Sequence, residues 1–167
     1  MIRGRRILLR PLSTRDLAEI SSWDDDEEVV RWVGKGGLVA MGEDGPHLAT
    51  NRCFIYGIEN EKGLLIGYIA LIDIIWRRAT AELRVCIGKA AFRNKGYGTE
   101  AIRTFLEFLK TSTTISQVYL RVYRENERAI RCYEKCGFKK RAVLRAGSRE
   151  SEEFKDLVLM ELCPNVV

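Results

Sequence analysis

One segment of the chain has the residue types of an anion-binding loop. It reads Arg93-Asn94-Lys95-Gly96-Tyr97-Gly98-Thr99 and lies directly between a predicted strand and an amphipathic helix. The first turn of such a helix points unpaired backbone N–H groups outward, and the helix dipole favours negative charge there. The glycines permit close approach of a ligand or a positive φ angle, and the Arg and Lys add formal charge. This combination suits a diphosphate.

Taken alone, the loop pattern leaves two interpretations open. It lacks the G-K-[ST] ending of a Walker A loop and the G-x-G-x-x-G spacing of a Rossmann nucleotide site. The alternative interpretation is a glycine-containing turn with basic side chains on the surface, which would have the same sequence pattern. The choice between these interpretations depends on the elements around the loop.

Helical periodicity follows the loop and recurs further along the chain. Residues 98–110 and 126–136 each place apolar side chains on one face, and the second segment stops at Gly137, a typical helix-ending residue. Two more helices are predicted near the N-terminus. One begins at Ser13, with Asp16 placed to complete a capping box, and the other begins at about Asp26.

Seven strands are predicted, over residues 6–10, 52–59, 64–74, 79–87, 118–123, 138–145 and 154–163. A short turn over residues 60–63 joins the second and third strands into a hairpin. In the fourth strand, one side carries Ala81, Leu83, Val85 and Ile87, and the other carries Glu82, Arg84 and Cys86. Helices set among strands predict a mixed α/β sheet covered by helices, whereas residues 34–46 are predicted to form a loop.

The composition narrows the class of protein. The chain has 167 residues, 46% of them hydrophobic and 31% charged, which predicts one folded domain and excludes a disordered protein. No apolar stretch is long enough to span a bilayer, and the basic N-terminus is not followed by the apolar segment of a signal peptide. Five cysteines without a C-x-x-C pair and a single histidine, His47, predict no metal site. We expect reduced thiols and a cytoplasmic location.

The net charge of +5 is unevenly distributed along the chain. Residues 1–80 carry 11 basic and 12 acidic side chains, whereas residues 81–167 carry 17 and 11. A basic C-terminal half favours an anionic partner, either nucleic acid or a phosphorylated cofactor. Acidic side chains are interleaved with the basic ones and no nucleic-acid-binding motif is present, so we do not expect nucleic acid.

Two motifs in order give the chain a resemblance to a known family. The loop Arg93–Thr99 resembles the R-x-x-G-x-G pyrophosphate signature of the GNAT superfamily of acetyl-CoA-dependent N-acyltransferases. The segment from Asn126 to Phe138 resembles its second cofactor motif, N-E-x-A-I-x-x-Y-x-K-x-G-F. The resemblance covers about residues 5–163. It implies a single N-acetyltransferase domain over residues 1–167, with a mostly antiparallel sheet of six to seven strands, about four helices and two splayed central parallel strands.

The resemblance also implies roles for individual residues. The pantetheine arm of acetyl-CoA would lie in the gap between the splayed strands, against the backbone of Val85, Cys86 and Ile87. The pyrophosphate would lie on the loop residues Arg93, Asn94, Lys95, Gly96, Tyr97, Gly98 and Thr99. Asn126 and Tyr133, about 10 Å apart on one helix face, would contact the pantetheine and the sulfur. Tyr133 would then protonate the leaving thiolate, unless it is an aromatic residue that packs against the sheet.

A base is the second requirement, because an amine with a pKa near 10 arrives protonated. Glu82 is the candidate, acting directly or through water. The alternative is a carboxylate that faces solvent and pairs with Arg84 or Arg78. Cys86, close to the expected thioester, leaves an acyl-enzyme route open beside direct transfer. Cys132 and Cys136, one turn apart, are interpreted as small apolar residues on a buried face.

The acceptor is the least determined part of the prediction. Arg10-Pro11-Leu12 and residues 77–83 resemble the ribosomal-protein N-terminal alanine/serine acetyltransferases, and the same features together with the acidic run at 24–28 also resemble the spermidine N-acetyltransferases. The acidic run either binds a cationic acceptor or forms a solvated helix start. Trp23, Trp32 and Trp76 either line an acceptor pocket or belong to the core.

The predicted function is therefore transfer of acetyl from acetyl-CoA to a primary amine by direct attack in a ternary complex. The acceptor is a protein N-terminus or a small amine such as a polyamine, and the protein is a monomer or a homodimer. A basic nucleic-acid-binding module and a CoA-binding protein without activity remain as alternatives.

Overall fold

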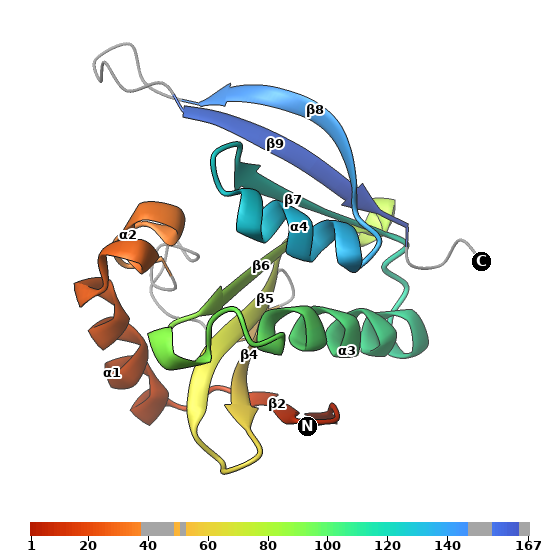
Figure 1. Ribbon diagram of the computed structural model, residues 1–167. Coiled ribbons are helices and arrows are strands. Elements are labelled where there is room, and N and C mark those ends of the chain that lie inside the picture. Colours follow the sequence, from red (N-terminus) through yellow and green to blue (C-terminus); the bar gives the residue numbers. More distant parts are fainter. Residues whose placement is uncertain (38–48, 51–52, 147–154, 164–167) are drawn as a thin grey trace.

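The computed structural model describes residues 1–37, 49–50, 53–146 and 155–163 (Figure 1). Most of the predicted loop 34–46, and also His47, lie outside these residues. The four principal helices are α1 (Thr14–Ser22), α2 (Glu27–Val33), α3 (Tyr97–Ser112) and α4 (Glu127–Lys135). The strands are β1 (Ile2–Arg3), β2 (Ile7–Pro11), β3 (Ala49–Thr50), β4 (Cys53–Asn60), β5 (Leu65–Ile75), β6 (Thr80–Ile87), β7 (Gln117–Tyr123), β8 (Lys139–Ala146) and β9 (Lys155–Leu162).

The strands form one sheet in the order β1-β2-β4-β5-β6-β7-β9-β8, with β3 paired to β4. Every pair is antiparallel except β6 with β7. The mixed, mostly antiparallel fold and all seven predicted strands are confirmed. The expected total of six to seven strands was too low, because the described residues also contain the two-residue strands β1 and β3. Segments this short carry no alternation from which a strand could be predicted.

Helices cover both faces of the sheet, so each face has its own core. Apolar residues of α3 and α4 pack on one face, where the fully buried Phe105 and Ile102 lie at the centre. Residues of α1 and α2 pack on the other face, around Trp23 and Tyr68. Figure 1 shows α1 and α2 grouped apart from α3 and α4. The alternation of β6 follows this division, since Leu83 belongs to the first core and Cys86 to the second.

The two parallel strands diverge after a short contact. β6 and β7 pair only from Thr80 to Glu82 and from Gln117 to Tyr119, yet both strands continue beyond these residues. Their later residues therefore leave a gap in the middle of the sheet. This is the splay that the resemblance implied.

The starts of α1 and α2 are fixed by short-range bonds. Ser13 donates from its backbone N–H and its hydroxyl to Asp16 at 2.6 and 2.8 Å, and Arg10 binds the same carboxylate with two nitrogens at 2.8 Å each. These contacts hold the pKa of Asp16 well below its ordinary value, with the Arg10 hydrogen bond as the largest cause. Asp26 caps α2 by accepting from the N–H groups of Glu28 and Val29. No helix in the described part of the chain is long and apolar enough to cross a membrane.

Candidate active site

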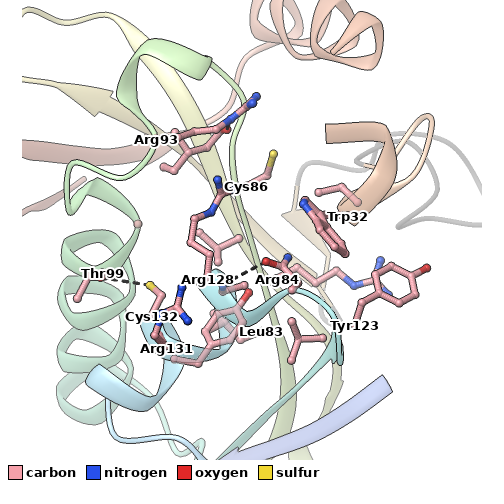
Figure 2. Close-up of a pocket in the computed structure, with 18 of the residues that line it drawn as sticks. Trp32, Leu83, Arg84, Cys86, Arg93, Thr99, Tyr123, Arg128, Arg131 and Cys132 are labelled. Atoms are coloured by element: carbon pink, nitrogen blue, oxygen red, sulfur yellow. Dashed lines mark hydrogen bonds between the residues drawn. The ribbon is translucent and has the colours of Figure 1, made fainter. Parts of the chain in front are cut away.

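A cavity of about 610 Å³ lies at the gap between β6 and β7 (Figure 2). Its walls come from the loop before α3, from α4, from the diverging ends of β6 and β7, and from α2. The predicted residues in the lining are Glu82, Val85, Cys86, Ile87, Arg93, Asn94, Gly96, Gly98, Thr99, Asn126 and Tyr133. The structure therefore brings both sequence motifs and the candidate base to one site.

The loop before α3 has the backbone of an anion site. Gly96 has a φ of +84° and forms the N-cap, so that α3 begins at Tyr97. The N–H groups of the first helical turn have no partner within the helix and are oriented toward a ligand at this end. Arg6 fastens the loop from outside by donating to the carbonyl of Lys95 at 3.2 Å and by stacking on the Tyr97 ring at 4.6 Å.

Two of the predicted cofactor residues lie outside the cavity lining. Lys95 is exposed, and the buried side chain of Tyr97 donates to a carboxylate oxygen of Glu61 at 3.2 Å. Tyr97 also packs edge-on against Phe92. The Tyr97 side chain anchors the loop to the β4–β5 hairpin, so only its backbone remains available to a cofactor.

The sequence predicted that Arg93 adds free positive charge to the loop, and its environment in the structure is different. Its side chain is only 9% exposed. It donates to the carbonyls of Ile87 and Gly88 at 2.9 and 2.6 Å, and it pairs with Asp26 at 3.0 Å and Glu28 at 3.1 Å. Its charge is therefore neutralised by carboxylates of the acidic run, and the side chain joins α2 to the loop.

Three more cationic side chains reach the cavity from α4. Arg128, Arg131 and Lys135 all line the cavity, at the end of α4 or along the face next to α3. Arg128 forms an ion pair with Glu28 across the cavity, and Arg131 pairs with Glu127 at 3.3 Å. The sequence pattern held no signal for these residues beyond the positive charge of the C-terminal half.

Asn126 is the N-cap of α4 and not its first residue. Its side-chain oxygen accepts from the N–H of Ala129 at 3.2 Å. The oxygen is thus used to start the helix, and the NH₂ group is the part of the side chain left to a ligand. Gly137 follows the helix with a φ of +97°, which confirms the predicted helix end.

Tyr133 reaches the gap from the α4 side. Burial raises the pKa of its hydroxyl above the ordinary value near 10, and the neighbouring Cys132 and Cys86 raise it further. Cys86 lies on the face of β6 that α1 and α2 cover, so it acts on Tyr133 through the gap between β6 and β7. A hydroxyl that stays protonated at neutral pH is suited to donate a proton to a thiolate. The ring also packs edge-on against Phe138 at 6.0 Å, so it is part of the core as well.

Glu82 is buried, with 2% of its surface exposed, and the alternative of a carboxylate facing solvent is wrong. Glu82 lies where β6 is paired on both sides, opposite Ile72 of β5 and Tyr119 of β7. Arg121 binds the carboxylate with two nitrogens, at 2.8 and 3.2 Å, and Arg84 lies 3.7 Å away. The sequence offered Arg84 as a partner, but Arg121 comes from the neighbouring strand and could not be predicted.

Cys86 and Cys132 are thiols of opposite character in the same lining. Burial raises the pKa of Cys86 to about 12, so its thiol is protonated at neutral pH. The pKa of Cys132 is lowered to about 6, with a hydrogen bond from Cys136 as the largest cause. Cys132 also contacts the Thr99 hydroxyl at 3.2 Å, shown by a dashed line in Figure 2. Cys132 and Cys136 pack against the core as partly buried apolar residues, as expected, and Cys132 also lines the cavity.

The side of the gap that faces α2 has aromatic walls. Trp32 lines it and lies 6.2 Å from the ring of Tyr123, which comes from the end of β7 (Figure 2). Trp23 instead stacks on Tyr68 in the core, and Trp76 contacts Phe54 outside the cavity. Of the three tryptophans, Trp32 alone is in the lining.

These features fit acetyl-CoA. An open helix start with a left-handed glycine suits the pyrophosphate, and the basic side chains of α4 suit further phosphate charge. The gap between β6 and β7 leaves room for an extended arm beside unpaired strand edges. Six basic residues of the C-terminal half line this cavity: Arg84, Arg93, Arg121, Arg128, Arg131 and Lys135.

The fold and the site define a CoA-dependent acyltransferase. The family description "Acetyltransferase (GNAT) domain" matches residues 6–139, and the chain belongs to this family. The resemblance seen in the two motifs is confirmed, and the protein is an enzyme that transfers acetyl from acetyl-CoA to an amine.

Relatives with named activities agree with this assignment. The spermidine N(1)-acetyltransferase of Escherichia coli (strain K12) is 28% identical over 138 residues, which cover 79% of this chain and 72% of that protein. The aminoglycoside N(6')-acetyltransferase type 1 of Klebsiella pneumoniae is 27% identical over 153 residues, or 83% and 76% of the two chains. The crystal structure of Vibrio cholerae spermidine N-acetyltransferase with CoA and spermine has a TM-score of 0.79 at 23% identity, covering 95% and 96%, and has the same fold.

Proposed function

We propose that acetyl is transferred directly, in a ternary complex formed at the gap between β6 and β7. One observation supports this most strongly. Tyr133 reaches the gap from the α4 side, and Glu82 lies on the face of β6 that α2 covers. The cofactor arm and the acceptor amine would therefore meet from opposite faces of the sheet. The raised pKa of Cys86, at about 12, argues against an acyl-enzyme on that thiol.

The residues would divide the chemistry as follows. The start of α3 holds the pyrophosphate, and the NH₂ group of Asn126 contacts the pantetheine. The amine lone pair attacks the thioester carbon, the carbon–sulfur bond breaks, and Tyr133 gives its proton to the departing thiolate. Both oxygens of Glu82 already accept from Arg121, so Glu82 would take the amine proton through a bridging water.

Direct transfer is tested by measuring initial velocities while the concentrations of both substrates are varied. A ternary complex gives intersecting lines in double-reciprocal plots, whereas an acyl-enzyme gives parallel lines. Cys86→Ala is the matched control, since it removes the buried thiol of β6 from the lining and should leave kcat within about threefold in a direct mechanism. Parallel lines that disappear in this variant would refute direct transfer.

The charge of the acceptor side bears on the kind of amine. Among the described residues on the α2 side of the gap, Arg84 and Arg121 face the single carboxylate of Glu82. Asp26 and Glu28 of the acidic run are held by Arg93 and Arg128. This arrangement supports an amine next to a carboxylate, such as the N-terminus of an acidic peptide. It does not support a polycation, although the named relatives act on spermidine and aminoglycosides.

A substrate comparison decides between these acceptors. Release of CoA thiol is measured with spermidine, with an aminoglycoside, and with a peptide that carries an acidic second residue. We expect the peptide to have the highest kcat/KM and Arg121→Met to lower it by more than tenfold. Faster turnover of spermidine than of the peptide would refute the assignment of a carboxylate-bearing amine and place this chain with the polyamine enzymes.

The assembly state and location are further proposals. A Vibrio cholerae spermidine N-acetyltransferase forms a dodecamer. We propose instead a monomer or homodimer for this chain, located in the cytoplasm, where its five free cysteines would stay reduced. Light scattering after gel filtration measures the mass directly, and a mass of twelve chains would refute the first part.

A further inference from the structure

Two cysteines of α4 form a thiol pair next to the cofactor loop. Cys132 lines the cavity and contacts the hydroxyl of Thr99 at 3.2 Å. Cys136, one turn later, has one S–H, which reaches either the backbone carbonyl of Thr99 at 3.7 Å or the sulfur of Cys132. Thr99 is in the first turn of α3, so the sulfur of Cys132 lies where that turn meets the cavity.

The charges around Cys132 favour a thiolate. Lys135 follows on the same helix, and Arg103 approaches from α3, where it also donates to the carbonyl of Lys135 at 2.7 Å. With the hydrogen bonds from Cys136 and Thr99, these groups lower the pKa of Cys132 to about 6. The same pair raises the pKa of Cys136, and burial raises that of Cys53 and Cys86, so those thiols remain protonated at neutral pH.

We propose that Cys132 is a modification site for small anionic disulfides, and that its modification excludes acetyl-CoA from the groove. The Cys132 thiolate attacks one sulfur of the disulfide R–S–S–R. One sulfur–sulfur bond forms, the original one breaks, and R–S⁻ leaves to take a proton from water. The attached group would occupy the space beside Thr99 that the cofactor needs. Arg128, Arg131 and Lys135 in the lining favour a reagent with carboxylates.

The rate of modification has a characteristic pH dependence. At pH 6 a thiol with a pKa of about 6 is roughly half ionised, whereas an ordinary thiol with a pKa near 8.5 is about 0.3% ionised. The lower nucleophilicity of the weaker base cancels about thirteenfold of this difference. At equal access, Cys132 should react about tenfold faster than a model peptide thiol at pH 6, and slower than that peptide at pH 8.

The experiment uses the full chain with dithiobis(nitrobenzoate), which is anionic, and with cystamine, which is cationic. Rates at pH 6 and pH 8 are normalised to the model peptide, and the modified cysteine is found by peptide mass mapping. We expect Cys132 to be modified first at pH 6, with a larger normalised rate for the anionic reagent. Saturating acetyl-CoA should slow this reaction at least tenfold.

Matched variants show whether the fast reaction belongs to Cys132. Cys163→Ser removes an exposed thiol outside the cavity and should leave the fast phase intact. Cys132→Ser should abolish it, and Cys136→Ala should slow it at pH 6 because the hydrogen bond that stabilises the thiolate is lost.

Three results would overturn the proposal: modification of Cys163 before Cys132 at pH 6, no difference between the two reagents, or no protection by bound acetyl-CoA. The proposal rests on the cofactor groove of the proposed function, so cofactor binding is checked separately by thermal unfolding. Absence of any acetyl-CoA effect on the unfolding temperature would count against that groove, whereas stabilisation without protection of Cys132 would count against the modification site alone.

Discussion

Replacing Arg93 with alanine tests whether this residue is a structural link or a ligand of the cofactor. The wild-type guanidinium satisfies the carbonyls of Ile87 and Gly88 and pairs with the carboxylates of Asp26 and Glu28. Because these contacts exist within the protein itself, their loss must lower stability in the absence of any ligand. A side chain that served the pyrophosphate alone would leave the stability of the free protein unchanged.

The expected magnitude follows from the exposure of the partners. Removing one member of a buried ion pair costs about 3–5 kcal/mol. The side chains of Asp26 and Glu28 are 30% and 38% exposed, so water can reach them after the change, and we expect the lower end of this range. A loss of about 3 kcal/mol in the free energy of unfolding corresponds to a fall of about 6–12 °C in Tm for a chain of this size.

The assay is thermal unfolding of the protein without ligand, with Lys95→Ala as the matched control from the same loop. Lys95 is exposed, so its truncation should change the free energy of unfolding by less than about 0.5 kcal/mol. A double-mutant cycle of Arg93→Met with Asp26→Asn should give a coupling energy of about 1–3 kcal/mol, because the second change removes the stranded carboxylate.

One outcome would refute this reasoning. If Arg93→Ala kept the Tm of the free protein within about 2 °C but weakened acetyl-CoA binding tenfold or more, Arg93 would be a cofactor ligand and not the link described above. A coupling energy near zero with Asp26 would lead to the same conclusion.

Three further predictions concern activity, the loop and acid stability. Tyr133→Phe should lower kcat for CoA release by about 10²–10⁴-fold while leaving the stabilisation by acetyl-CoA intact; an unchanged kcat would exclude it as the acid. Gly96→Ala should lower the free energy of unfolding by about 1–2 kcal/mol because of its positive φ angle, and Gly98→Ala, whose added carbon would lie 3.8 Å from its nearest neighbour, should not; equal Tm values for the two would contradict this. The pKa of Asp16 is depressed in the folded protein, so its contribution is present above the unfolded value near 3.9 and is lost as the pH falls toward the folded value. Asp16→Asn should therefore flatten the acid side of the Tm-against-pH curve, and an unaltered curve would show that the Arg10 contact contributes nothing.

The fold could be predicted because local signals and long-range pairing agree. Strand β6 alternates cleanly, the hairpin turn at Asn60 closes with its own side-chain hydrogen bonds, and Ser13 with Asp16 forms the expected cap. The splay was inferred from the family resemblance and not from the residues. No residue pattern in β6 or β7 predicts that their pairing ends at Glu82 and Tyr119.

The site could be predicted in its backbone but less well in its charges. Glycine spacing identified the start of α3, since only glycine readily adopts the φ of Gly96. The partners of ions, however, depend on elements far apart in sequence. Arg93 and Asp26 are 67 positions apart in the sequence, and Glu82 and Arg121 are 39 apart. Pairs this far apart produce no periodic pattern from which they could be predicted. The lowered pKa of Cys132 depends first on Cys136, one turn later in the same helix, and only then on Thr99 and Arg103 from another helix.

The double attachment of α2 constrains how this enzyme can diverge. Glu28 holds Arg93 of the loop and Arg128 of α4, and Asp26 holds Arg93 as well. A change of acceptor preference made by replacing α2 would disconnect the cofactor loop unless the incoming segment kept both carboxylates. Variation in acceptor choice is therefore freer at Trp32, on the same helix but without a part in these ion pairs, and a library randomised there should retain folded, cofactor-binding members more often than one randomised at Asp26 or Glu28.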